Sequence, residues 1–177
     1  MENNQKTLKD SIEFNGVGLH TGKKVCLVIN PAKENHGIKF QRIDLPEAPI
    51  IPADIDLVKD TKRSTTLELN NVKIITVEHL MSALYALGVN NVLVKINNSE
   101  VPILDGSAKL FVEGIQKVGL KDQKAPLKFI HLPKPIHYKD AESGSEILFV
   151  PANNFILSVV LDYQNPVLGT QYAEIRN

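Results

Sequence analysis

The sequence has one cysteine, Cys26, and no tryptophan among its 177 residues. A single thiol cannot form an internal disulfide, and it cannot build a metal site from four sulfur ligands. Cys26 lies between Val25 and Leu27 in an apolar run, which predicts a small buried hydrophobic side chain. A disulfide-stapled fold and a four-sulfur metal centre are therefore excluded.

The sequence also lacks a charge excess and any long apolar run. Its 20 Lys and Arg residues balance 20 Asp and Glu residues, and no basic cluster indicates a nucleic-acid partner. Apolar stretches such as 155–161 fall well short of the roughly 20 residues of a membrane span. The polar stretch Met1–Asp10 does not resemble a secretory signal. We therefore expect a cytoplasmic protein with no transmembrane segment and no nucleic-acid partner.

The composition is otherwise that of a globular protein, with 43% hydrophobic and 23% charged residues. The length allows one domain, or one domain and the start of a second. Strand patterns cover 11–14 and 24–29, and the glycine-rich segment 16–22 between them predicts a turn. Another strand is expected at 38–43. The first part of the chain is thus rich in strands.

Two helices are expected further along the chain. The first begins after Thr76, a plausible N-cap, and ends at Gly88. Its apolar stripe at helical spacing comprises Val77, Leu80, Met81, Leu84 and Leu87. The second covers 108–118 between Ser107 as cap and Gly119, with Leu110, Phe111, Ile115 and Val118 expected on its inward face. With a strand at 92–96 between them, this pattern predicts an α+β fold.

A domain boundary is expected at 121–126, which is polar and has no periodicity. We therefore predict a first domain at 1–120, a linker at 121–126 and a second domain at 127–177. The second segment repeats the order strand, glycine turn, strand and Pro-Ala ending, which is a weak internal repeat. About 50 residues are too few to complete such a domain, so the second unit is expected to be incomplete.

Glu78 and His79 are the strongest candidates for chemistry, because they lie in the first turn of a predicted helix and outside its apolar stripe. The helix N-terminus disfavours a charged imidazole, and the neutral ring is the form that binds a metal. A neighbouring carboxylate could take a proton from a metal-bound water. A dipole-favoured acid beside a solvated histidine is, however, the commoner origin of such a pair. The other histidines have no ligand spacing relative to His79.

The glycine-rich segment 16–22 is not a nucleotide-binding loop. It lacks the Lys-Ser/Thr pair of a Walker A motif, and it joins two strands, whereas a dinucleotide fingerprint leads from a strand into a helix. A tight hairpin with glycines at positive φ explains it.

Three stretches together resemble the signature motifs of the UDP-3-O-acyl-N-acetylglucosamine deacetylase family: Gly16-Val17-Gly18-Leu19-His20-Thr21-Gly22, Thr76-Val77-Glu78-His79-Leu80 and Pro102-Ile103-Leu104-Asp105-Gly106-Ser107-Ala108. Their order and spacing are those of the family, and the similarity extends from about Thr7 to Asp162. This resemblance favours a functional origin for the Glu78–His79 pair.

The resemblance implies a role for individual residues. His79 matches a zinc ligand, and Glu78 matches the general base. Leu19, His20 and Thr61 match positions that line the substrate cleft. The implied fold has two similar domains, each a two-layer sandwich of a mostly antiparallel sheet and two helices.

The resemblance further implies a bacterial hydrolase of lipid A biosynthesis that uses Zn2+ to deacetylate a UDP-linked acylated amino sugar. The family's other two zinc ligands and its second catalytic histidine would lie beyond Asn177. The chain would then need the C-terminal half of the same enzyme as its partner, and it should be inactive alone.

Two other functions remain open. The same sandwich could be a non-catalytic binding module, since fold alone does not define function. The chain could also be the deacetylase part of a bifunctional polypeptide fused to an acyl-carrier dehydratase, which resembles an arrangement found in some bacteria.

Overall fold

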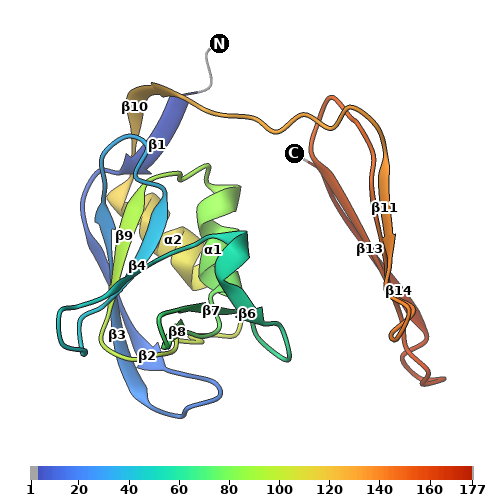
Figure 1. Cartoon of the computed structure of the whole chain (residues 1–177), viewed down its shortest axis with the longest axis horizontal. Coiled ribbons are helices and arrows are strands. Elements are labelled where there is room, and N and C mark those ends of the chain that lie inside the picture. Colours follow the sequence, from blue (N-terminus) through green and yellow to red (C-terminus); the bar gives the residue numbers. More distant parts are fainter. Residues whose placement is uncertain (1–3, 177) are drawn as a thin grey trace. The chain divides into compact units, whose positions relative to one another are not determined.

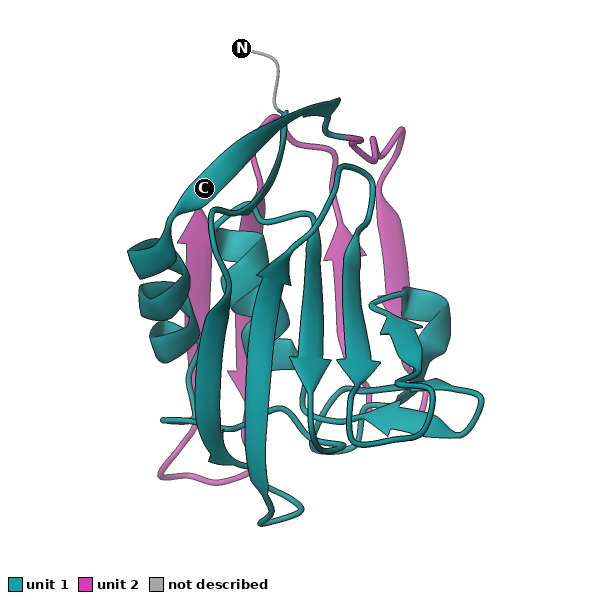
Figure 2. Ribbon diagram, turned by 90° about the vertical axis from the view of Figure 1, so that its left-hand side faces the viewer, with its two compact units in different colours: residues 1–127 teal, residues 128–177 magenta. Residues whose placement is uncertain are grey.

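The computed structural model describes residues 4–176, which form two compact units with a division after Leu127. Figure 2 colours unit 1 (residues 1–127) and unit 2 (residues 128–177) separately. The parts of the sequence predictions that concern Met1 to Asn3 and Asn177 lie outside the described residues.

Unit 1 contains ten strands, two α-helices and one 3-10 helix among its described residues. The strands are β1 (Asn4–Leu8), β2 (Ile12–Val17), β3 (Lys24–Pro31), β4 (Ile38–Arg42), β5 (Ile50–Pro52), β6 (Val58–Asp60), β7 (Thr66–Leu69), β8 (Val72–Ile74), β9 (Val92–Ile96) and β10 (Leu120–Pro126). The helices are η1 (Ile55–Leu57), α1 (Glu78–Ala86) and α2 (Lys109–Val118). The predicted strand at 92–96 and both predicted helices are present.

The main sheet has the strand order β2-β3-β9-β4-β5, and only the β4–β9 pair is parallel. Alternate residues of its strands point to one face, as the strand period requires. The fully buried members of that face include Leu27, Ile29, Phe40, Val94 and Ile96. β6, β7 and β8 form a separate small antiparallel sheet.

Both helices cover one face of the main sheet and pack against each other (Figure 1). Phe111 of α2 meets Phe14 of β2 edge to face, with ring centroids 4.9 Å apart. Leu80 and Leu84 of α1 are fully buried, as the stripe predicted. The predicted inward position of Leu110 is wrong, because this side chain is 39% exposed. The α+β sandwich is thus confirmed.

Replacing Gly114 of α2 with alanine is expected to destabilise unit 1 by up to about 2 kcal/mol. Alanine gains about 1 kcal/mol of helix propensity over glycine. The added Cβ, however, would lie 2.7 Å from the Phe14 ring and 2.8 Å from Ile12 Cδ1, and such overpacking costs about 1–3 kcal/mol. Urea unfolding followed by circular dichroism measures the difference.

The exposed residue Ser82 of α1 provides the control, since Ser82→Ala adds propensity without a clash and should change stability by less than about 0.5 kcal/mol. A Gly114→Ala variant more stable than the wild type would show that the Phe14 ring can move aside.

Residues 121–126 are not a linker, which corrects the predicted boundary. They belong to β10, which pairs antiparallel with β1, with Thr7 opposite Lys121 and Leu8 opposite Leu120. The segment is polar because most of its side chains are exposed, whereas its backbone hydrogen bonds fix it to β1. The division into units therefore falls at Leu127–Lys128.

Cys26 also departs from expectation, because it is partly exposed. Val25, Leu27 and Ile29 occupy the core face of β3, so the alternation of the strand places Cys26 on the opposite face. Burial, followed by the neighbouring Glu13 carboxylate, raises the pKa of the Cys26 thiol.

Unit 2 consists of two antiparallel hairpins within residues 128–176. Their strands are β11 (Ile136–Lys139), β12 (Glu146–Phe149), β13 (Ile156–Asp162) and β14 (Thr170–Arg176). The β11–β12 hairpin repeats the layout of β2–β3, with a left-handed glycine in each connection, Gly22 and Gly144. Apolar side chains of β13 and the residue before it are exposed, namely Phe155, Leu157, Val159 and Leu161.

Among residues 4–176, none of the helices is long and apolar enough to cross a bilayer.

Candidate active site

The N-terminus of α1 presents Glu78 and His79 at its first two positions, and both side chains are partly exposed. Val77, buried in the core, is the N-cap and makes no side-chain capping bond. The predicted capping role of Thr76 is therefore wrong. Thr76 instead has a φ of 61°, which is rare for a β-branched residue, and is 2% exposed. A strained turn thus leads directly into the Glu78–His79 pair.

Glu78 is held by the loop between β6 and β7. The backbone N–H of Thr65 donates to Glu78 Oε2 over 3.0 Å, and the Val77 N–H donates to the Thr65 carbonyl over 3.4 Å. These bonds fix one carboxylate oxygen, whereas Oε1 accepts no hydrogen bond from residues 4–176. Glu78 therefore has one anchored oxygen and one oxygen available to a bound molecule.

The imidazole ring of His79 has no hydrogen bond to any residue in the described part of the chain. The described residues also contain no group of three or more His, Cys, Asp or Glu side chains that could hold a metal ion. A catalytic zinc normally has three protein ligands and an open position. The ring of His79 is thus available as one metal ligand, but residues 4–176 do not supply a complete zinc site.

The loop Gly18–Gly22 is built around Glu100, a carboxylate only 1% exposed. The N–H of His20 donates to its Oε1 over 2.9 Å, and the N–H of Thr21 donates to its Oε2 over 2.8 Å. Gly18 leaves room for this carboxylate, because a Cβ there would lie 2.3 Å from Glu100 Oε2. Gly18 is therefore required by close approach. The segment does connect the antiparallel pair β2–β3, but of Gly16, Gly18 and Gly22 only Gly22 has the predicted positive φ.

Glu100 is ionised at neutral pH in spite of its burial. Burial by itself raises the pKa of Glu100, but hydrogen bonds from the His20 N–H, from the Thr21 hydroxyl and N–H, and from Thr76 outweigh it and lower that pKa below its ordinary value. The Thr76 hydroxyl donates to Glu100 Oε1 over 3.0 Å. Buried charge is tolerated here because several donors surround it.

Because the folded state lowers the pKa of Glu100, its contribution to stability is present above the ordinary Glu range and lost as the pH falls through the folded pKa. We expect Glu100→Gln to cost about 1–3 kcal/mol near pH 6, since the amide nitrogen would face the Thr21 N–H. This difference from the wild type should shrink as the pH falls from about 6 to about 3. Urea unfolding across that range measures it, and a difference independent of pH would contradict the assignment.

The predicted cleft residues lie on two loops. Leu19 is 59% exposed and, with the exposed His20, belongs to the Gly18–Gly22 loop. Thr61 is exposed in the β6–β7 loop that anchors Glu78. No hydrogen bond of the described residues joins the side chains of Leu19, His20 or Thr61 to Glu78 or His79. Glu78 itself connects the β6–β7 loop to the start of α1, and the Glu100 carboxylate connects the Gly18–Gly22 loop to Thr76 just before it.

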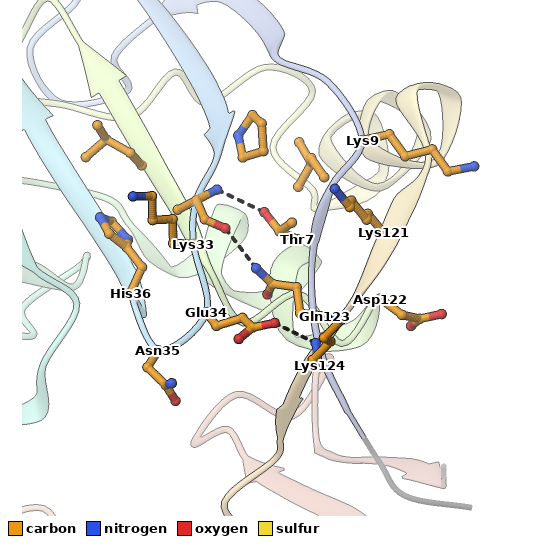
Figure 3. Close-up of a pocket in the computed structure, with 14 residues that line it drawn as sticks. Thr7, Lys9, Lys33, Glu34, Asn35, His36, Lys121, Asp122, Gln123 and Lys124 are labelled. Atoms are coloured by element: carbon orange, nitrogen blue, oxygen red, sulfur yellow. Dashed lines mark hydrogen bonds between the residues drawn. The ribbon is translucent and has the colours of Figure 1, made fainter.

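A separate open groove of about 1000 Å³ lies beside β1 and β10 and contains none of the predicted site residues (Figure 3). Its polar groups largely satisfy one another: the Thr7 hydroxyl accepts from the Ala32 N–H, Gln123 donates to the Ala32 carbonyl, and Glu34 accepts from the Lys124 N–H. These bonds fasten the β3–β4 connection to the β1–β10 pair. The groove is thus lined by residues that hold these elements of unit 1 together.

Sequence reasoning missed Thr65 and Glu100. The role of Thr65 uses only its backbone N–H, which no residue type reveals. Glu100 follows Asn97, Asn98 and Ser99, and a carboxylate after such a polar turn is typical of a solvent-exposed position. Its one sequence signal is the apolar run that begins at Val101.

Comparison with known proteins shows which family this sequence matches. A family model described as UDP-3-O-acyl N-acetylglycosamine deacetylase matches residues 5–177. A UDP-3-O-acyl-N-acetylglucosamine deacetylase of Teredinibacter turnerae is 48% identical over 163 residues, which are 92% of this chain and 53% of that protein. That of Methylococcus capsulatus is 46% identical over 173 residues, 97% of this chain and 56% of that protein.

A bifunctional enzyme LpxC/FabZ of Bacteroides thetaiotaomicron is 46% identical over 173 residues, which are 98% of this chain and 38% of that protein. The chain therefore spans about half the length of the monofunctional relatives, and less of the bifunctional one.

Proposed function

This chain belongs to the UDP-3-O-acyl-N-acetylglucosamine deacetylase family, and we propose that it supplies the base and one metal ligand of such a deacetylase. The substrate would be the UDP-linked, O-acylated N-acetylglucosamine named for the relatives. We further propose that the reaction is the committed step of lipid A synthesis and takes place in the cytoplasm.

One observation carries this proposal: Glu78 and His79 are adjacent at a helix N-terminus, and each offers an unoccupied donor or acceptor. Glu78 Oε2 is anchored by the Thr65 N–H, which leaves Oε1 for a reacting water. Neighbouring helix positions diverge by about 100° around the axis, so the two side chains can approach one water from different sides.

His79 fits a zinc ligand, because its ring is partly exposed and has no competing hydrogen bond within residues 4–176. Zinc bound there and by ligands supplied from outside this chain would act as a Lewis acid toward a water and the acetyl carbonyl. The proposed partner is therefore the C-terminal half found in the longer relatives.

The role of Glu78 is to remove a proton from the attacking water. The water oxygen bonds to the acetyl carbon, the carbon–nitrogen bond breaks, and the proton held by Glu78 can pass to the departing amine. The products are acetate and the free amine of the glucosamine. A general base positioned in this way typically contributes about 10²–10⁴-fold to the rate.

A second candidate function is the deacetylase part of a bifunctional polypeptide, which the match to the bifunctional LpxC/FabZ enzyme of B. thetaiotaomicron favours. In that case the same Glu78 and His79 chemistry would operate, and an acyl-carrier dehydratase would follow in the chain. The sequence of the complete reading frame distinguishes the two.

The test compares this chain with a polypeptide that continues it through the remaining part found in the deacetylase relatives, called here the extended polypeptide. We expect the extended polypeptide to bind about one zinc per chain and to deacetylate the UDP-sugar. The 177-residue chain should bind zinc weakly and show no measurable turnover, because one imidazole does not complete a three-ligand site. Metal analysis and acetate release are the measurements.

Within the extended polypeptide, His79→Ala should lose bound zinc, whereas His36→Ala, which alters a histidine on the β3–β4 connection, should retain it. Tight equimolar zinc and turnover in the short chain would refute the half-site proposal.

A further inference from the structure

Glu100 connects the two segments to which the proposed function assigns roles. Its Oε1 accepts both the His20 N–H and the Thr76 hydroxyl, and its Oε2 accepts the Thr21 N–H. One buried carboxylate therefore bonds to the loop carrying Leu19 and His20 and to the turn that leads into α1.

The backbone around Glu100 reinforces this connection. Ile75 and Glu100 form an isolated parallel bridge, in which the Ile75 N–H donates to the Ser99 carbonyl over 2.8 Å and the Val101 N–H donates to the Ile75 carbonyl over 3.0 Å. The residue after Ile75 is Thr76, with its φ of 61°. The bridge and the Thr76–Glu100 hydrogen bond together hold that residue in its unfavourable conformation.

The conformation of Thr76 determines where the next residues go. A change of its φ toward the ordinary negative range would redirect Val77, Glu78 and His79, because the chain turns at this position. The Gly18–Gly22 loop is equally constrained. Gly18 has no side chain, so the Glu100 carboxylate can lie closer to its backbone than any Cβ would permit. Neither segment can shift without breaking a bond to the same carboxylate.

We infer that Glu100 is a positioning residue that fixes the Leu19–His20 loop and the Glu78–His79 turn in one arrangement. The inference rests on the proposed function, because that function assigns roles to the two segments. The hydrogen bonds by which Glu100 couples the segments can, however, be tested without measuring activity. Glu100 does not touch the substrate in this proposal; it acts through Thr76 and through the N–H groups of His20 and Thr21.

The first test uses hydrogen exchange in the 177-residue chain and needs no substrate or metal. Glu100→Gln should accelerate exchange of the Thr21 amide by about tenfold or more, because the side-chain amide nitrogen cannot accept its N–H. Exchange of the amides at the start of α1 should accelerate as well. Glu113→Gln, which alters an exposed carboxylate of α2, should leave both regions unchanged. Unchanged exchange in Glu100→Gln would overturn the inference.

The second test separates positioning from general stability in the extended polypeptide. Thr76→Val keeps the side-chain shape but removes the hydroxyl, and it should lower kcat by about tenfold through displacement of Glu78 and His79. Thr76→Ser keeps the hydroxyl and should remain within about twofold of the wild type. Equal kcat in all three proteins would overturn the inference even if the melting temperatures differed.

Failure of the proposed function has a different signature. If Glu78→Gln retained full turnover, Glu78 would not be the base, whereas the exchange experiment would still report whether Glu100 couples the two segments.

Discussion

Glu78→Gln in the extended polypeptide is expected to lower kcat by about 10²–10⁴-fold, the range that a general base contributes. Glutamine preserves the size of the side chain and can still accept the Thr65 N–H through its carbonyl oxygen. It cannot accept a proton from water. The chemical step should therefore fail while the start of α1 keeps its structure. Steady-state kinetics with the UDP-sugar measures kcat and KM.

Two controls make this result specific. Zinc content should stay near one per chain in Glu78→Gln, because the proposed ligand His79 is intact, and KM should change little. Glu13→Gln, which alters an exposed carboxylate of β2, should leave kcat unchanged. A Glu78→Gln variant with normal kcat would show that the anchored carboxylate has a structural role only.

The elements that carry this site were predictable where local rules determine them. The apolar stripe of α1 predicted which face is buried, and Gly88 and Gly119, both at positive φ, follow the ends of the helices as expected. Glu78 and His79 were recognisable because they lie off that stripe. Periodicity thus locates the candidate residues, since it reflects packing within one element.

The surroundings of the site were not predictable, because they depend on contacts between distant segments. Glu100 is 80 residues from His20 and 24 from Thr76, and its burial follows from the bridge between Ile75 and Glu100. Apart from the apolar run that follows it, no local pattern distinguishes Glu100 from a surface carboxylate. The capping role assigned to Thr76 failed for the same reason, since the hydroxyl bonds to Glu100 instead of to the helix backbone.

The misplaced boundary at 121–126 has a related cause. An edge strand can consist largely of polar residues, because its stability comes from backbone pairing and only a few buried side chains. Here the partner is β1, more than 110 residues earlier in the chain, with Lys6 opposite Asp122. The local sequence does not indicate that β10 pairs with so distant a strand. A polar stretch before a new unit is therefore predicted to be a linker.

Gly18→Ala is expected to destabilise unit 1 by about 3 kcal/mol, a large effect for one added methyl group. Its Cβ would lie 2.3 Å from Glu100 Oε2 and 2.4 Å from the Thr21 hydroxyl, so the carboxylate or the loop must move. Movement of Glu100 would leave the N–H groups of His20 and Thr21 without their acceptor. Urea unfolding followed by circular dichroism measures the loss.

Gly22 in the same loop provides the matched control, because it isolates the backbone cost. Its φ is 63° and a Cβ there would meet no atom within 4 Å, so Gly22→Ala should cost only the left-handed penalty of about 1–2 kcal/mol. Gly18 has no such φ, and its cost is therefore steric. If Gly18→Ala proved less destabilising than Gly22→Ala, the buried Glu100 carboxylate would be mobile. It could then not hold the Leu19–His20 loop and the Glu78–His79 turn in one arrangement.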